Sequence, residues 1–140
     1  MSVRFDMQRK NARENTFILI FEQVCKKDET AEEIFEKATT VRGLEYDDYV
    51  KTVFFGANEN AQIIEETIAK HSVGWKKDRI SPVSMAVLRL AIYEMMFMSD
   101  IPGRVSINEA IELSKKYDDE KSYAFVNGVL NAVNVELSEG

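Results

Sequence analysis

The stretch 101-IPGRVSINEAIELSKKYDDEKSYAFVNGVL-130 decides how the C-terminal part of this chain folds. In its first half, one stripe at helical spacing is formed by Ile107, Ala110, Ile111 and Ser114. The acidic residues 118–120 then end this helix and favour the start of another, because acids stabilise a helix N-terminus. The second helix, from about Lys121 to Leu137, is predicted to bury Val126, Val129, Leu130 and Val133.

The preceding segment, from Ser81 to Met98, is apolar on nearly all sides. Arg89 and Glu94 interrupt it, and a membrane span needs about 20 apolar residues, so a surrounded core helix is the better interpretation. Ser81 and Pro82 are typical of an N-cap and a first helical residue. We expect Arg89 and Glu94 each to be satisfied inside the protein by backbone carbonyls or neighbouring polar groups.

Helical spacing also dominates the N-terminal part of the chain. A helix is predicted over Met7–Cys25, a short one over Ala31–Thr39 and a long one over Tyr46–Ser72. Thr30 with Glu33, and Ser106 with Glu109, are spaced as capping boxes. The sequence therefore predicts an all-α fold of six or seven helices in one domain, residues 1–140. The segment 74–79 is the expected seam between an N-terminal half, about 1–75, and a C-terminal half, about 76–140.

The net charge of −6 argues against a general nucleic-acid binder, but it is unevenly distributed. Residues 1–13 carry Arg4, Arg9, Lys10 and Arg13 against Asp6, a net charge of +3. A basic end on an acidic body indicates a local anion site. The N-terminus has no signal-peptide pattern, and a single cysteine cannot form an internal disulfide, so we expect a cytoplasmic protein.

No pattern in the sequence indicates a catalytic, metal or cofactor site. His71 and Cys25 are the single histidine and the single cysteine, and neither is part of a nucleophile or metal motif. A phosphate-binding glycine loop is absent from the sequence as well. We therefore predict a protein without enzymatic activity, metal or cofactor.

The basic run of residues 8–13 is the best local candidate for function. Positive charges in the first turns of a helix oppose the macrodipole, typically at a cost of about 0.3–1 kcal/mol each. Such a cluster either meets an anion or is a solubilising helix end paired with the chain's own acids, and composition alone does not separate the two. Phe125 is similarly open: it is either a second-face core residue or an exposed aromatic for a partner or a stacked base.

Three blocks of this sequence resemble the NusB family. The first is Arg9 to Glu14 followed by Phe21. The second is Gly74-Trp75 and Arg79, followed by 87-VLRLAIYE-94. The third runs through Ile101-Pro102, Val105, 107-INEAIEL-113 and Lys115 to 125-FVNGVL-130. The third block is the most specific of them.

The resemblance implies two perpendicular helical bundles and a role in transcription antitermination during ribosomal RNA synthesis. It implies binding of single-stranded boxA-type RNA together with NusE, a small-subunit ribosomal protein, within an RNA polymerase complex that contains other Nus factors. RNA binding is carried over to Arg9, Lys10, Arg13 and Phe125, and partner binding to Phe21, Glu94 and Lys121. The resemblance is compatible with a homodimer. We expect no membrane partner, because charged residues interrupt the most apolar stretch of the sequence.

Two departures from the family pattern concern the partner surface. Phe21 stands where the family often has tyrosine, and Lys121 where an acid is often found. Two alternatives stay open: a helical protein-interaction module without specific RNA binding, and a detached N-terminal domain of an RNA methyltransferase. The second requires an α/β cofactor-binding domain beyond Gly140.

Overall fold

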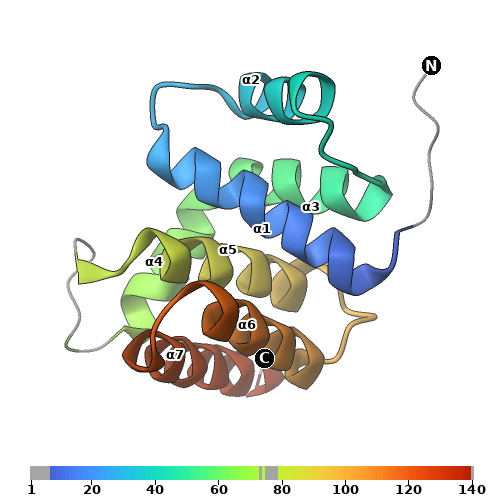
Figure 1. The fold of residues 1–140 in the computed structure, drawn as a ribbon. Coiled ribbons are helices and arrows are strands. Elements are labelled where there is room, and N and C mark those ends of the chain that lie inside the picture. The colour runs from blue at the N-terminus through green and yellow to red at the C-terminus, as the bar shows by residue number, and fades with distance from the viewer. Residues whose placement is uncertain (1–6, 73, 75–78, 140) are drawn as a thin grey trace.

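The computed structural model of the chain describes residues 7–72, 74 and 79–139, and within these ranges it contains seven α-helices and no strand (Figure 1). The predicted all-α class is therefore confirmed. The helices are α1 Arg9–Cys25, α2 Ala31–Glu36, α3 Asp48–Glu59, α4 Ala61–His71, α5 Pro82–Phe97, α6 Gly103–Tyr117 and α7 Glu120–Glu139. A short π-helical segment, Lys37–Val41, continues α2. Trp75, which carries part of the family resemblance, lies outside the described residues, as does Arg4.

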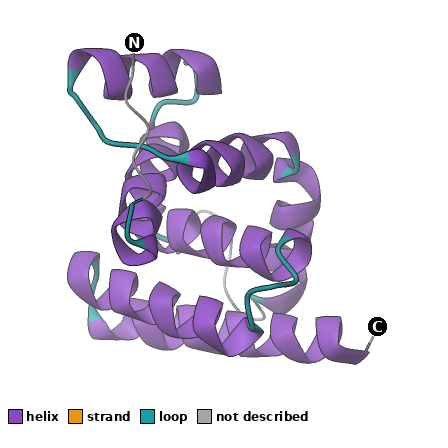
Figure 2. Cartoon of the chain, turned by 90° about the vertical axis from the view of Figure 1, so that its right-hand side faces the viewer, coloured by secondary structure: helices purple, strands orange, loops and turns teal. Residues whose placement is uncertain are grey.

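Helix α5 is the centre of the fold. It packs against α1, α3, α4, α6 and α7, and ten of its residues in the run 84–94 are buried. Figures 1 and 2 show α6 and α7 lying together on one side of it, with α2 at the opposite end of the molecule against α1. This position explains why its sequence is apolar on nearly all sides, as predicted for a surrounded helix.

Two of the predicted helix starts are confirmed. The hydroxyl of Thr30 accepts the backbone N–H of Glu33, whose carboxylate accepts the backbone N–H of Thr30 in return. Ser81 caps α5 by accepting the backbone N–H of Ser84, and Pro82 is the first helical residue. These motifs act between residues that are neighbours along the chain, so the sequence is sufficient to locate them.

The predicted capping box of Ser106 and Glu109 is wrong. Helix α6 begins three residues earlier, at Gly103, and Ser106 is a buried residue within it. Its hydroxyl donates to Oε1 of Glu94 at 2.7 Å. Ser106 therefore makes a long-range polar contact instead of the helix cap that the local pattern predicted.

The single long helix predicted over Tyr46–Ser72 is also wrong, because the chain breaks at Asn60 into α3 and α4. Asn60 has φ −106° and ψ 22°, outside the α-helical region, and its side-chain amide donates to the carbonyl of Gly56 at 2.8 Å. Asparagine competes for backbone hydrogen bonds in this way, and so favours helix ends. The apolar spacing continues through the break, since Val53 and Ala57 are buried in α3 and Ile64 and Ile68 in α4.

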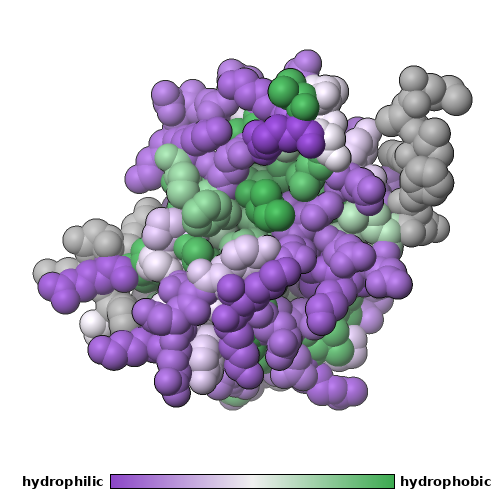
Figure 3. Space-filling view, viewed as in Figure 1, coloured by the Kyte–Doolittle hydropathy of each residue, from purple (hydrophilic) through white to green (hydrophobic). Residues whose placement is uncertain are grey.

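The surface over α1 differs from the surface over α6. Figure 3 shows apolar side chains gathered over α1 below α2, and hydrophilic side chains covering α6. Three half-buried apolar residues of α1, Ile18, Phe21 and Val24, pack against the core. Over the described residues, no helix is both long and apolar enough to cross a membrane.

Candidate functional site

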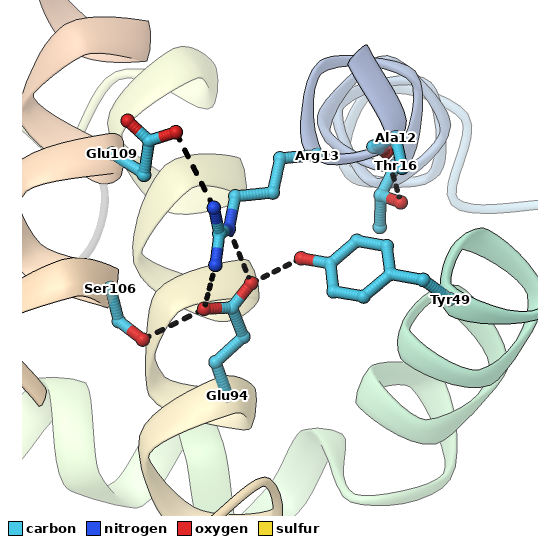
Figure 4. Close-up of polar contacts among 7 residues, drawn as sticks. All are labelled: Ala12, Arg13, Thr16, Tyr49, Glu94, Ser106 and Glu109. Carbon is cyan, nitrogen blue, oxygen red and sulfur yellow. Dashed lines mark hydrogen bonds and ion pairs between the residues drawn. The ribbon is translucent and has the colours of Figure 1, made fainter. Parts of the chain in front are cut away.

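Glu94, near the C-terminal end of α5, is a completely buried carboxylate. Its Oε2 accepts from Nε of Arg13 at 2.7 Å, and its Oε1 accepts from Nη2 of the same residue at 3.2 Å. The hydroxyls of Tyr49 and Ser106 also donate to this carboxylate (Figure 4). A buried charge persists in a protein interior when it is paired and hydrogen-bonded in this manner. One carboxylate thereby joins α1, α3, α5 and α6.

Arg13 supplies the cation of this cluster and is itself only 6% exposed. Its Nη1 lies 3.3 Å from Oε1 of Glu109 on α6, so its guanidinium bridges two carboxylates from different helices. Burial alone would lower the pKa of Arg13, but the hydrogen bond and charge of Glu94, with smaller contributions from Tyr49 and Glu109, raise it. The guanidinium therefore stays charged, and its donors point into the protein.

Tyr49 occupies the second position of α3, where the helix meets the start of α1. Asp47 fixes this helix end, because its carboxylate accepts the backbone N–H of Val50 at 3.0 Å. Burial, followed by the charge and hydrogen bond of Glu94, raises the pKa of Tyr49 well above its ordinary value. The phenol therefore remains protonated and donates its hydrogen to Glu94.

Two predicted surface residues, Arg13 and Glu94, lie in the interior. Arg13 was expected to hold an RNA phosphate, but its guanidinium is engaged by Glu94 and Glu109. Glu94 was expected on a partner surface, but it has no exposed area. The physical reason is the same for both, since a buried acid in an apolar helix needs a buried cation. The other expectation for Glu94, that polar neighbours satisfy it, is confirmed. The sequence does not identify Tyr49 as part of a site, because its partner Glu94 is 45 residues away in the chain.

Arg9 and Lys10, the first two residues of α1, are exposed. The guanidinium carbon of Arg9 lies 4.4 Å from the centre of the Tyr49 ring, within the range of a cation–π contact. Lys10 borders a groove of about 230 Å³ between α1 and α6, lined also by Arg13, Glu14, Glu109, Glu112, Leu113 and Lys116. Two of the three predicted basic residues therefore lie on the surface, Arg9 against Tyr49 of α3 and Lys10 at the groove between α1 and α6.

Glu14 and Lys116, which both line this groove, form an ion pair. The Lys116 ammonium and the Tyr117 hydroxyl both donate to Oε2 of Glu14. These two hydrogen bonds, of which the one from Lys116 has the larger effect, lower the pKa of Glu14. An intramolecular acid–base pair between Glu14 and Lys116 therefore exists at this end of α1. Within the basic run, Arg13 is paired with Glu94 and Glu109. The charge of Lys10 makes a smaller contribution to the lowered pKa of Glu14, so the chain's own acids engage part of this run.

The remaining predicted residues lie elsewhere on the molecule. Phe21 is half-buried, with its ring centre 6.0 Å from that of Phe17, and it is twelve residues along α1 from Arg9, roughly 18 Å at the rise of a helix. Phe125, in the first two turns of α7, is half-buried and packs against the core, while Lys121 is exposed. A role of these three residues in binding stays a prediction.

The acidic and histidine side chains do not gather into a metal site within the described part of the chain, where no group of three or more potential ligands occurs. His71 lies at the end of α4, and its Nε2 is 3.1 Å from Oε2 of Glu136 on α7. Cys25 is exposed at the end of α1. Among the described residues, the hydrogen bonds between buried side chains are those made to Glu94.

The sequence of this chain is similar to known proteins over most of its length. The model of the NusB family matches residues 10–134. The transcription antitermination protein NusB of Bacillus licheniformis is 43% identical over 131 residues, covering 94% of this chain and 99% of the relative.

Solved structures of NusB proteins also superpose on most of this chain. NusB of T. maritima superposes with a TM-score of 0.81 at 34% identity, covering 97% of this chain and 100% of the other. A crystal structure of the antitermination factors NusB and NusE in complex with dsRNA contains a chain that matches with a TM-score of 0.79 at 31% identity. That match covers 91% of this chain and 96% of the other.

Proposed function

This chain belongs to the NusB family, and we propose that it is a transcription antitermination factor that binds RNA together with NusE. The observation that carries the proposal is the likeness over most of the chain to a protein solved with both NusE and RNA. The exposed cations Arg9 and Lys10 at the start of α1 supply the charge that an RNA backbone requires. We propose that the protein acts without catalysis.

In this mechanism, Arg9 and Lys10 contact phosphates, while Arg13 holds α1 against α5 and α6. The number of phosphate contacts then falls from the three expected from sequence to two. Each contact with a single strand contributes roughly −0.7 to the slope of log affinity against log salt concentration, so the expected slope is about −1.4. The buried pair of Arg13 and Glu94 enters RNA binding only by fixing the helix that carries the other two cations.

Phe125 and the partner residues complete the proposal. Phe125 offers a half-buried ring to an unstacked base, because sequence-specific RNA recognition mostly uses splayed bases of single strands. Phe21 on α1 and Lys121 on α7 are proposed to contact NusE. We propose that the assembly extends to an elongating RNA polymerase with other Nus factors in the cytoplasm, and that a homodimer forms in the absence of these partners.

Fluorescence anisotropy tests the proposal with three labelled RNAs: a boxA-type single strand, its scrambled sequence and the boxA-type sequence in a duplex. The duplex is needed because the solved NusB–NusE complex contains dsRNA. We expect the boxA-type strand to bind more tightly than the scrambled one, and NusE to strengthen that binding. Equal weak binding to all three with NusE present would overturn the RNA-binding role.

The rival function is a helical protein-interaction module without specific RNA binding. Replacing Arg9 and Lys10 with glutamate, which reverses their charge, distinguishes the proposed function from this rival. If RNA binding is the function, RNA affinity falls while the amount of NusE retained in a pull-down stays constant. If the rival is correct, the charge reversal changes neither measurement.

A further inference from the structure

The contact between Arg9 and Tyr49 links the exposed start of α1 to the interior. The guanidinium carbon of Arg9 lies 4.4 Å from the centre of the Tyr49 ring, while Arg13, one turn later, lies 6.0 Å from the same ring. A cation–π contact is an attraction between the charge and the face of the ring, so it does not occupy the N–H donors of the guanidinium with hydrogen bonds. Arg9 is thus held by an aromatic ring without losing its capacity to bind a phosphate.

The Tyr49 ring is itself held in place. It is only 6% exposed, and its hydroxyl donates to Oε2 of Glu94. Glu94 is fixed in turn by Arg13 and Ser106, from two further helices. A continuous series of contacts therefore runs from the centre of the molecule, through one carboxylate and one phenol, to a surface cation.

This series offsets two costs that a cation at a helix start would otherwise carry. The positive end of the α1 macrodipole opposes Arg9, while the electron-rich face of a tyrosine attracts it. A free arginine also loses side-chain freedom when it binds a phosphate, and a stacked one has already lost part of it. Arg9 is consequently better prepared for an anion than Lys10, which makes no cation–π contact within the described part of the chain.

We infer that Tyr49 is a positioning residue for RNA binding, with its hydroxyl anchored by Glu94 and its ring holding the Arg9 guanidinium in the orientation that meets a phosphate. The inference rests on the proposed function, because it concerns how the same RNA surface is built. Tyr49 need not touch the RNA itself. Its effect on affinity is expressed through Arg9 alone.

A double-mutant cycle on the full chain tests this inference, with Tyr49→Leu and Arg9→Gln made singly and together. The readout is the affinity for labelled single-stranded boxA-type RNA, measured by anisotropy. In the wild-type background, Tyr49→Leu should weaken binding about two- to fivefold, because Arg9 must then lose on binding the side-chain freedom that the ring otherwise restricts beforehand. In the Arg9→Gln background it should change nothing further. Tyr49→Phe, which keeps the ring and loses the hydroxyl, provides a variant that retains the buried volume.

Three outcomes are informative. If Tyr49→Leu weakens binding by the same factor in both backgrounds, tyrosine acts through the general fold, and the inference is overturned while the proposed function stands. If Tyr49→Phe leaves affinity unchanged in the wild-type background, the anchor at Glu94 is overturned. If Arg9→Gln itself has no effect on RNA binding, the phosphate contact of the proposed function fails and the inference fails with it. Lys26→Gln, at the other end of α1, is the matched control and should bind as the wild type does.

Discussion

Arg13 and Glu94, which are 81 residues apart in the chain, form a buried ion pair with two hydrogen bonds. The pair joins the first helix to the central one. Because both side chains lie in the interior, neither is free to act on the surface, although both positions match the family pattern in sequence. The pair explains why a helix that is otherwise apolar contains a glutamate.

Replacing Glu94 with glutamine should strongly destabilise the fold. The amide keeps the size of the side chain but leaves the Arg13 guanidinium buried with only the more exposed Glu109 as a charged partner. Breaking a buried pair from one side typically costs about 3–5 kcal/mol of unfolding free energy. Urea unfolding monitored by circular dichroism measures it. Glu112→Gln, at an exposed position of α6, is the control and should stay within about 0.5 kcal/mol. Equal unfolding midpoints for the two variants would contradict the assignment.

Neutralising Arg9 or Lys10 should weaken RNA binding and reduce its dependence on salt. Each change removes one expected phosphate contact, so the slope of log affinity against log salt concentration should become shallower by about 0.7. Thermal melting should change little, because both side chains are exposed and the contact of Arg9 with Tyr49 contributes only about 0.5–1 kcal/mol at an exposed site. The control Lys26→Gln lies about 25 Å along the same helix from Arg9 and should preserve the wild-type slope. If the slope is the same in all three variants, Arg9 and Lys10 do not contact RNA phosphates.

Glu14 should make stability depend on acid pH. Its hydrogen bonds with Lys116 and Tyr117 hold its pKa below the ordinary value of 4.5, so the folded state binds the proton more weakly than the unfolded state does. The stability that the charged carboxylate contributes is therefore fully present above pH 4.5, and is lost as the pH falls through the lowered pKa of the folded state. The difference in unfolding free energy between the wild type and Glu14→Gln should narrow over this acidic interval. A difference that is constant from pH 7 to pH 3 would show that the contact contributes nothing through its charge.

Two helical glycines should respond oppositely to alanine. A Cβ on Gly56 in α3 would lie 2.5 Å from Cζ of Tyr93, a buried side chain of α5, so Gly56→Ala should cost about 1–3 kcal/mol of stability through overpacking. A Cβ on Gly128 in α7 would meet nothing within 4 Å, so Gly128→Ala should stabilise the helix by up to about 1 kcal/mol. Paired urea titrations compare them. Destabilisation by both substitutions would mean that the exposed face of α7 is not open.

The sequence predicted the buried residues of the last helix correctly. Val126, Val129, Leu130 and Val133 are all buried in α7, as their spacing required. The prediction succeeded because helical periodicity places residues three and four apart on one face, whatever that face contacts. The prediction of one long helix failed at Asn60, because its side chain bonds the backbone and ends α3 although the apolar spacing continues into α4.

The sequence by itself determined the all-α class, the surrounded central helix, the caps at Thr30 and Ser81, and a basic start of the first helix. These features follow from interactions between residues that are close along the chain. Only the tertiary structure decided that Arg13 turns inward to Glu94 while Arg9 stays on the surface against Tyr49. The physical reason is that the cost of burying a charge depends on which partners the other helices bring to it, and those partners come from distant parts of the chain.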